Sequence, residues 1–122
     1  MMDSMGKVVV GLIRGRHEMP CTDFIFDSDV APLDFDGMAK VIRAFIADKV
    51  GVSATYYGPA DNIADFADCK VWTGDKDLIV YVTGLTAATT ALCAECARSG
   101  VTLTLMHFDR DSGDYVPQHI WG

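Results

Sequence analysis

Hydrophobic residues in this chain follow patterns that predict alternating strands and helices. Lys7 to Ile13 is almost continuously apolar, which is typical of a strand buried on both faces of a parallel sheet. Leu78 to Val82 has the same pattern, and Val101 to Met106 resumes it after an alanine-rich stretch, Thr86 to Arg98, that predicts a helix. A strand, a helix and a strand in about thirty residues form a βαβ unit, whose two strands are parallel. The pattern therefore predicts an α/β fold.

A second helix is predicted after Asp34, because apolar residues then recur at three- and four-residue steps on one helical face. Asp34 can cap its amino end, Gly51 stands where a left-handed terminator is common, and Gly37 should weaken the first turn slightly. Shorter segments complete the pattern. We expect brief strands at Phe24–Phe26, Ser53–Tyr57 and Cys69–Thr73, a short helix at Ala60–Ala67, and a strand or ordered arm at Tyr115–Trp121.

Length and composition favour one domain. The 122 residues are half apolar and 22% charged, which suits a single hydrophobic core. We expect residues 1–6 to be a flexible leader and residues 7–122 to be a single α/β domain. The expected architecture is a small Rossmann-like, mainly parallel sheet flanked by helices.

The formal net charge of −7 disfavours binding to long nucleic acids, because that binding depends on many Lys and Arg side chains that neutralise phosphates. No segment has the roughly 20 apolar residues that span a bilayer, so we expect a cytoplasmic protein without a membrane partner. Its four cysteines, Cys21, Cys69, Cys93 and Cys96, should then be reduced thiols. Cys93 and Cys96 lie within the predicted helix, where buried small residues explain them better than a metal, and we expect no metal and no cofactor.

Three predicted strands end in polar segments that suit an anion. Arg14-Gly15-Arg16-His17 follows the first strand, Thr83-Gly84-Leu85-Thr86 follows the strand Leu78–Val82, and His107-Phe108-Asp109-Arg110 follows the strand Val101–Met106. If these strands are parallel, the three segments share one sheet edge, which is where open α/β sheets bind ligands.

Arg14 and Arg16 can each make bidentate contacts to a phosphate, and His17 can act as a general acid or base near neutral pH. We therefore take Arg16 and His17 as candidate catalytic residues and Arg14, Gly15 and Arg16 as candidate ligand-binding residues. The alternative is a surface turn whose arginines pair with some of the seventeen acidic residues.

Thr83, Gly84, Leu85 and Thr86 join a strand to a helix amino end, where free N–H groups and the helix dipole favour an anion. The segment lacks the Gly-Lys-Ser/Thr loop of P-loop proteins and the GxGxxG fingerprint. The alternative is an ordinary helix start with Thr86 as its N-cap.

The third segment offers groups for a nucleobase. Phe108 or Tyr115 can stack on a base, Arg110 can hold a phosphate, and Gln118 can read a base edge. The alternative is that Asp109 and Arg110 simply pair with each other.

Three stretches carry a resemblance to a known family: RGRHEMP at 14–20, LIVYVTGLTAATTAL at 78–92 and LTLMHFDRDSGDYVPQ at 103–118. Together they resemble the small CRISPR-associated Rossmann-fold domains, and in particular the compact ring-nuclease-like members. The resemblance covers about a third of the chain. It rests on an Arg-His pair after the first strand and a small-residue loop that opens a helix.

This resemblance implies a homodimer that binds a cyclic oligonucleotide second messenger of prokaryotic antiviral defence across its two-fold axis. Arg16, His17 and the loop 83–86 are the positions that carry over, and ring cleavage without a metal stays open. Two alternatives remain. One is a phage-type sponge that sequesters the nucleotide intact, and the other is an acidic protein–protein interaction module that uses Trp72, Trp121 and the carboxyl-terminal tail.

Overall fold

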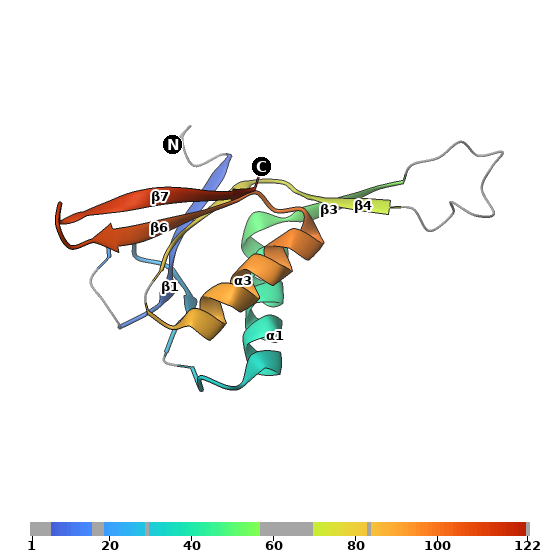
Figure 1. Ribbon diagram of the computed structural model, residues 1–122. Coiled ribbons are helices and arrows are strands. Elements are labelled where there is room, and N and C mark those ends of the chain that lie inside the picture. Colours follow the sequence, from blue (N-terminus) through green and yellow to red (C-terminus); the bar gives the residue numbers. More distant parts are fainter. Residues whose placement is uncertain (1–5, 16–18, 29, 57–69, 83, 122) are drawn as a thin grey trace.

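A five-stranded sheet forms the centre of the computed structural model, which describes residues 6–15, 19–28, 30–56, 70–82 and 84–121 (Figure 1). The strand order is β2-β1-β5-β6-β7; the first four strands are parallel, and β7 is antiparallel to β6. The strands are β1 (Lys7–Ile13), β2 (Phe24–Phe26), β5 (Asp77–Tyr81), β6 (Leu103–Asp109) and β7 (Asp114–Trp121). A separate antiparallel pair, β3 (Val52–Tyr56) and β4 (Lys70–Gly74), extends away from this sheet (Figure 1).

Two helices pack against each other and cover one face of the sheet (Figure 1). They are α1 (Phe35–Phe45), which continues as the π-helical turn η2 (Ile46–Val50), and α3 (Thr86–Ser99). The core between the helices and the sheet includes completely buried Leu12, Ile42 and Leu92. The fold is thus an α/β sandwich in which the described helices form a single layer.

Alternation along the strands explains which face is covered. In β1, Val10 and Leu12 point toward the helices and are buried, whereas Val9 points to the opposite face and is 45% exposed. Ile79 and Tyr81 in β5 lie beside Val9 and Gly11 in the register and are only half-buried. The face opposite the helices is therefore partly open to solvent.

Helix α1 begins as the sequence predicts. The Asp34 carboxylate accepts a hydrogen bond from the Gly37 N–H at 3.0 Å and caps the helix. A Cβ at position 37 would collide with this carboxylate, so glycine is the residue that the cap requires. Gly51 ends the helix at φ 80°, and its N–H donates to the Ile46 carbonyl at 2.8 Å.

Helix α3 is joined to α1 by an ion pair. The Glu95 side chain is 6% exposed, and its two carboxylate oxygens lie 3.1 and 3.3 Å from Nε and Nη2 of Arg43. This contact raises the pKa of Arg43. At its carboxyl end, α3 stops at Gly100, which has φ 67° and lies against the backbone of Trp72 in β4.

Most of the predicted elements are confirmed. The parallel unit β5-α3-β6 is present, Phe24–Phe26 is an edge strand, and Tyr115–Trp121 belongs to β7. Strand β6 runs three residues beyond the predicted end at Met106. Residues 1–5 of the leader expected at 1–6 and the helix expected at Ala60–Ala67 lie outside the described residues. Within the described part of the chain, no helix has the length and hydrophobicity needed to cross a bilayer.

Candidate ligand site at the carboxyl edge of the sheet

The carboxyl ends of β1, β5 and β6 lie at the same edge of the sheet, as the sequence predicts. Val10 pairs with Val80, which in turn pairs with Leu105, and all three strands are parallel. The chain runs from β1 outward to β2 on one side and returns to β5 on the other side. The boundary between β1 and β5 is therefore a topological switch point, where open α/β sheets bind their ligands.

Arg14 directly follows β1 and is held in a defined position. Its guanidinium stacks on the Phe24 ring, with Cζ 4.6 Å from the ring centroid. Nη2 lies 3.5 Å from both the Thr22 carbonyl oxygen and Asp27 Oδ1. Half of the Arg14 side chain is exposed, and the Asp27 side chain is 85% exposed, so this ion pair is weak. Arg14 is thus oriented but still accessible to an anion.

Gly15 makes the turn after Arg14 at φ 85°, with open space around its Cα. Arg16 and His17, the candidate catalytic residues, lie outside the described residues, as does Thr83. The structure therefore describes five of the candidates from these two loops: Arg14, Gly15, Gly84, Leu85 and Thr86.

Helix α3 begins at Thr86, as the sequence predicts, but the alternative in which Thr86 is its N-cap is wrong. Thr86 is the first helical residue and not the N-cap; Leu85 holds that position, with φ −82° and ψ 95°, and its side chain makes no capping hydrogen bond. The first turn contains no acidic residue, and a Cβ at Gly84 would meet no atom within 4 Å. Among the described residues, no side chain accepts a hydrogen bond from the first N–H groups of α3.

Three aromatic rings gather beside this edge. The Tyr81 and Tyr115 rings meet edge to face at 4.7 Å between centroids, and Phe108 meets Tyr115 at 5.4 Å. Burial raises the pKa of Tyr115, and nearby Cys21 and Tyr81 add to the increase. Phe108 is 43% exposed. The cluster thus presents an aromatic surface next to the carboxyl end of β5.

Tyr81 was not among the candidate site residues predicted from the sequence. The available signal was the alternation in β5, which places Leu78, Val80 and Val82 on the helix-covered face and Tyr81 on the other. Its partner across the sheet, Tyr115, could not be identified without the register of the β6–β7 hairpin.

Gln118 does not belong with Phe108, which corrects the predicted grouping. Phe108 pairs with Tyr115 whereas Gln118 pairs with Leu105, so the register places Gln118 and Phe108 on opposite faces of the hairpin. Gln118 Oε1 instead lies 2.8 Å from Nε2 of His107.

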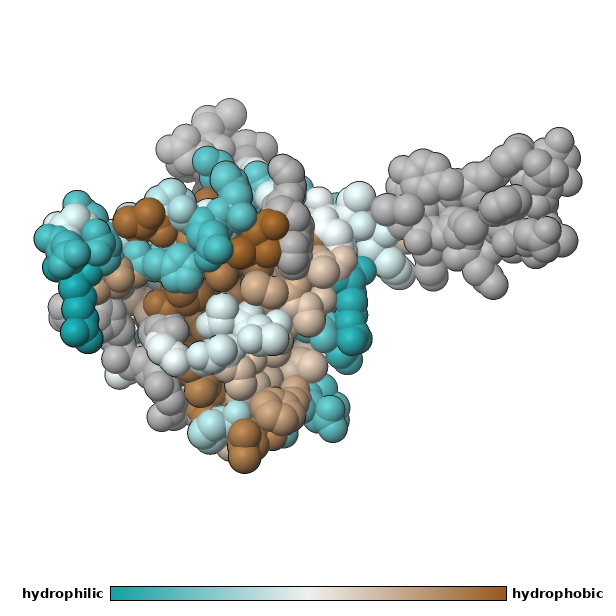
Figure 2. All heavy atoms as spheres, in the orientation of Figure 1, coloured by the Kyte–Doolittle hydropathy of each residue, from teal (hydrophilic) through white to brown (hydrophobic). Residues whose placement is uncertain are grey.

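Arg110 also lies away from the edge of the sheet. The last paired residue of β5, Tyr81, is opposite Met106, and Arg110 follows Met106 by four residues, or about 13 Å of strand. It begins the turn of the β6–β7 hairpin, where hydrophilic residues gather in Figure 2. The prediction failed because β6 and β7 extend past the rest of the sheet. Arg110 can reach a ligand only if that ligand extends along the hairpin.

The cysteines of α3 are structural. Cys96 is completely buried, and its burial, with smaller contributions from Cys93 and Glu95, raises its pKa to about 12. Burial also raises the pKa of Cys93. Both are neutral thiols at pH 7. Among the described residues, no three His, Cys, Asp or Glu side chains come together as metal ligands would.

Comparison of the chain with family models, with curated proteins and with solved structures gives no significant match. The geometry of the site is therefore the basis for its interpretation. An open helix amino end and an accessible arginine lie at the carboxyl edge, and the aromatic cluster lies on the face of the sheet opposite the helices.

Proposed function

We propose that the carboxyl edge of the sheet binds a small anionic nucleotide. The observation that carries the proposal is the uncapped amino end of α3, which lies beside exposed Gly84 at the switch point between β1 and β5. Backbone N–H groups at such a position suit a phosphate. The sequence resemblance to small CRISPR-associated Rossmann-fold domains favours a cyclic oligonucleotide second messenger of antiviral defence as the ligand, and a Rossmann-like ancestry for the sheet.

Each part of the site has a role in this proposal. The first turn of α3 accepts a phosphate, and the exposed half of Arg14 supplies a positive charge after β1. A base stacks on the exposed surface of Phe108, within the cluster that also holds Tyr81 and Tyr115. The resemblance also implies a homodimer, so the proposal includes a homodimer or higher oligomer.

Cleavage of the ligand is a separate step. His17 and Arg16 are the residues proposed to act on the ring, without a metal, if cleavage takes place. A sponge that holds the nucleotide intact would need only the binding residues. The two functions differ in the state of the released ligand.

The test is incubation of the purified protein with a panel of cyclic oligonucleotides and common nucleotides, followed by mass spectrometry before and after heat release. Depletion with intact release indicates a binder or sponge, and linear products indicate a nuclease. If linear products appear, His17→Ala should abolish them while binding remains.

A matched pair of variants locates the site. Thr86→Glu places a carboxylate at the first residue of α3, where it competes with a phosphate for the N–H groups. Thr90→Glu makes the same charge change one turn further along, at another exposed position of the same helix. We expect only Thr86→Glu to abolish binding. Equal binding by the two variants, or no binding of any ligand by the wild type, would refute the proposal.

An interaction module is the second candidate, because several large apolar side chains are exposed: Leu33, Phe35, Val41 and Trp72. Truncation of the carboxyl-terminal tail cannot test this function separately from folding, because the tail forms β7 and pairs along the length of β6. Truncation after Asp114 would remove a strand of the sheet. Substitution of Phe35, which is 58% exposed, is the cleaner test.

A further inference from the structure

His107 lies near the carboxyl end of β6, on the side of the sheet that the helices cover. Leu105 is buried against the helices, and His107, two residues further along the strand, points to the same side. The Val82 N–H donates to the Met106 carbonyl at 3.1 Å, so His107 lies beside Val82, where the chain leaves β5. From there the chain needs four residues, at most about 14 Å, to reach Thr86 at the start of α3. His107 is therefore near the amino end of α3.

The imidazole of His107 is oriented by Gln118. Its Nε2 lies 2.8 Å from Gln118 Oε1, and an amide oxygen only accepts, so Nε2 carries a proton and donates this hydrogen bond. The other ring nitrogen, Nδ1, has no hydrogen-bond partner among the described residues. One side chain thus holds the ring while its second nitrogen is available to a ligand.

The charged groups near His107 lie toward the turn of the hairpin. On the same side of the strands, Asp109 follows His107 in β6, and Asp114 of β7 is opposite Asp109 in the register. No described ion pair joins either carboxylate to His107, and Arg110 begins the turn beyond them. Val82 of β5 is uncharged, and the first turn of α3 contains no acid. Described acids are therefore absent between His107 and the amino end of α3.

We propose that His107 binds a second phosphate of the ligand and that Gln118 holds the imidazole in place for this contact. The inference rests on the proposed nucleotide function, in which the first turn of α3 accepts one phosphate. His107 and α3 belong to different layers of the sandwich, so two phosphates of one ligand occupy the two positions. The site therefore takes a nucleotide with at least two phosphates.

Protonation determines the strength of the contact. A free imidazole changes its charge at about pH 6.5. In the protonated ring Nδ1 donates to a phosphate oxygen, whereas in the neutral ring with its proton on Nε2 the lone pair of Nδ1 repels that oxygen. Gln118 Oε1 accepts from Nε2 in both states. Binding should therefore be tight at low pH and weaken as the pH rises through this range.

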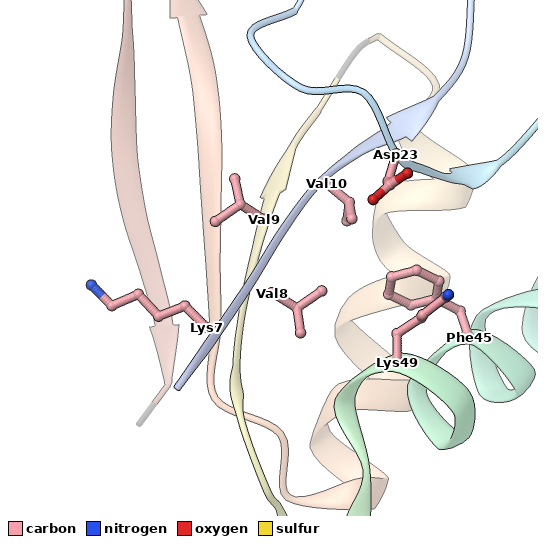
Figure 3. A pocket seen from close by; sticks show the side chains of 7 residues that line it. All are labelled: Lys7, Val8, Val9, Val10, Asp23, Phe45 and Lys49. Carbon is pink, nitrogen blue, oxygen red and sulfur yellow. The ribbon is translucent and has the colours of Figure 1, made fainter. Parts of the chain in front are cut away.

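The cavity of about 450 Å³ beside β1 is a second candidate place for an anion (Figure 3). It adjoins residues 7–10 of β1, whose edge on that side is left free by the three residues of β2, the described strand there. Its cation Lys49 lies 3.7 Å from Asp48, and Asp23 also lines the cavity, while Lys7 points to the other side of β1 (Figure 3). The positive charge of Lys49 is thus balanced by acids, which makes the cavity the less favoured place.

The test uses the linear trinucleotide ApApA, which has two phosphodiesters, with ApA, which has one, as its control. A phosphodiester has no second proton, so its charge is constant between pH 5.5 and pH 8. Isothermal titration calorimetry measures both affinities. We expect ApApA to bind about fivefold more tightly at pH 5.5 than at pH 8, and more tightly than ApA at pH 5.5. Equal affinities of ApApA at the two pH values would overturn the inference.

Three variants locate the pH dependence. His107→Asn removes the imidazole and should reduce the effect of pH on ApApA binding to less than about twofold. His119→Asn makes the same change on the other face of the hairpin, where Nδ1 of His119 lies 2.8 Å from Thr104 Oγ1, and should retain the effect. Lys49→Gln removes the cation of the cavity and should also retain it. A pH effect that persists in His107→Asn would assign it to another group and refute the inference.

The positioning role of Gln118 is tested by two substitutions. Gln118→Leu removes the acceptor of the Nε2 proton and should weaken ApApA binding at pH 5.5 about threefold. Gln118→Glu keeps an acceptor and adds a charge that favours the protonated ring, so the pH at which binding weakens should rise. A pH profile identical to that of the wild type in both variants would exclude this role.

NMR of the wild type measures His107 directly, with its imidazole C–H signals assigned by their loss in His107→Asn. By reciprocity, fivefold tighter binding to the protonated ring raises the midpoint of the His107 titration by about 0.7 pH units when ApApA saturates the protein. An unchanged midpoint would overturn the inference.

The outcomes separate this inference from the proposed function. Binding that Thr86→Glu abolishes, but that depends neither on His107 nor on pH, supports the nucleotide site and refutes only the role of His107. If the wild type binds neither ApApA nor ApA at either pH, and no other nucleotide of the panel, both proposals are wrong.

Discussion

The two helices of this fold begin in different ways. Helix α1 starts with a capping carboxylate from Asp34, followed by an acidic residue, Asp36, in its first turn. Helix α3 starts after Leu85, with no side-chain cap and no acid in its first turn. The first start supports the fold, whereas the second leaves N–H groups available at the edge where a ligand is expected. A helix start without a cap can thus indicate a binding site.

The largest effect is expected at the other end of α3, where Gly100→Ala should destabilise the protein by more than about 2 kcal/mol. Gly100 has φ 67°, and a Cβ there would collide with the Trp72 carbonyl group. Chemical denaturation measures the loss. In the matched variant, Gly113→Ala, the backbone has a similar φ of 77°, but the new Cβ would meet no atom within 4 Å. A loss at Gly113 as large as that at Gly100 would contradict this explanation.

The contact between the helices is tested by Arg43→Gln. This change leaves the buried Glu95 carboxylate with Arg98 as its remaining described cation, at 4.0 Å. We expect the Tm to fall by several degrees, because a buried carboxylate without its partner is unfavourable. Arg98→Gln retains the closer pair and should have a smaller effect. Thermal unfolding monitored by circular dichroism measures both variants.

Removal of the cap of α1 is expected to have the next largest effect on stability. Asp34→Ala takes away the acceptor for the Gly37 N–H and should lower the stability by about 1 kcal/mol. Urea denaturation checks this value. No change in stability would mean that water replaces the cap without cost.

The smallest effects on stability are expected from two variants that compare the amino ends of the two helices. Asp36→Thr removes an acid from the first turn of α1 and should lower stability by a few tenths of a kcal/mol, whereas Thr86→Glu adds one to α3 and should raise it similarly. Ligand binding should follow the opposite order, because Thr86→Glu blocks the site and Asp36→Thr does not touch it. A variant Thr86→Glu that is less stable than wild type would show that the start of α3 does not accept a negative charge.

Local sequence patterns were sufficient to predict most of the described helices and strands of this fold. The apolar run of β1, the spacing of Met38 and Ile42 in α1, and the terminator at Gly100 are each encoded within a few residues. Such signals need no knowledge of the rest of the chain.

The features that were missed depend on distant residues. Arg43 and Glu95 are 52 positions apart, and nothing near either residue indicates their contact. The orientation of Gln118 depends on the register of the β6–β7 hairpin, in which a shift of one residue exchanges the faces. The free edge of β1 exists because its neighbour is a strand of three residues, a fact about pairing that periodicity does not contain.

The antiparallel pair β3–β4 leaves and rejoins the domain at nearly the same point. The Asp75 N–H donates to the Gly51 carbonyl at 2.8 Å, and the pairing continues through Ala54 and Trp72 and ends at Tyr56 and Lys70. A two-residue Asn-Gly turn can therefore close the hairpin directly after this last pair. The segment is then a natural insertion point, at which sequence can be exchanged or a reporter grafted while the five-stranded sheet keeps its connections.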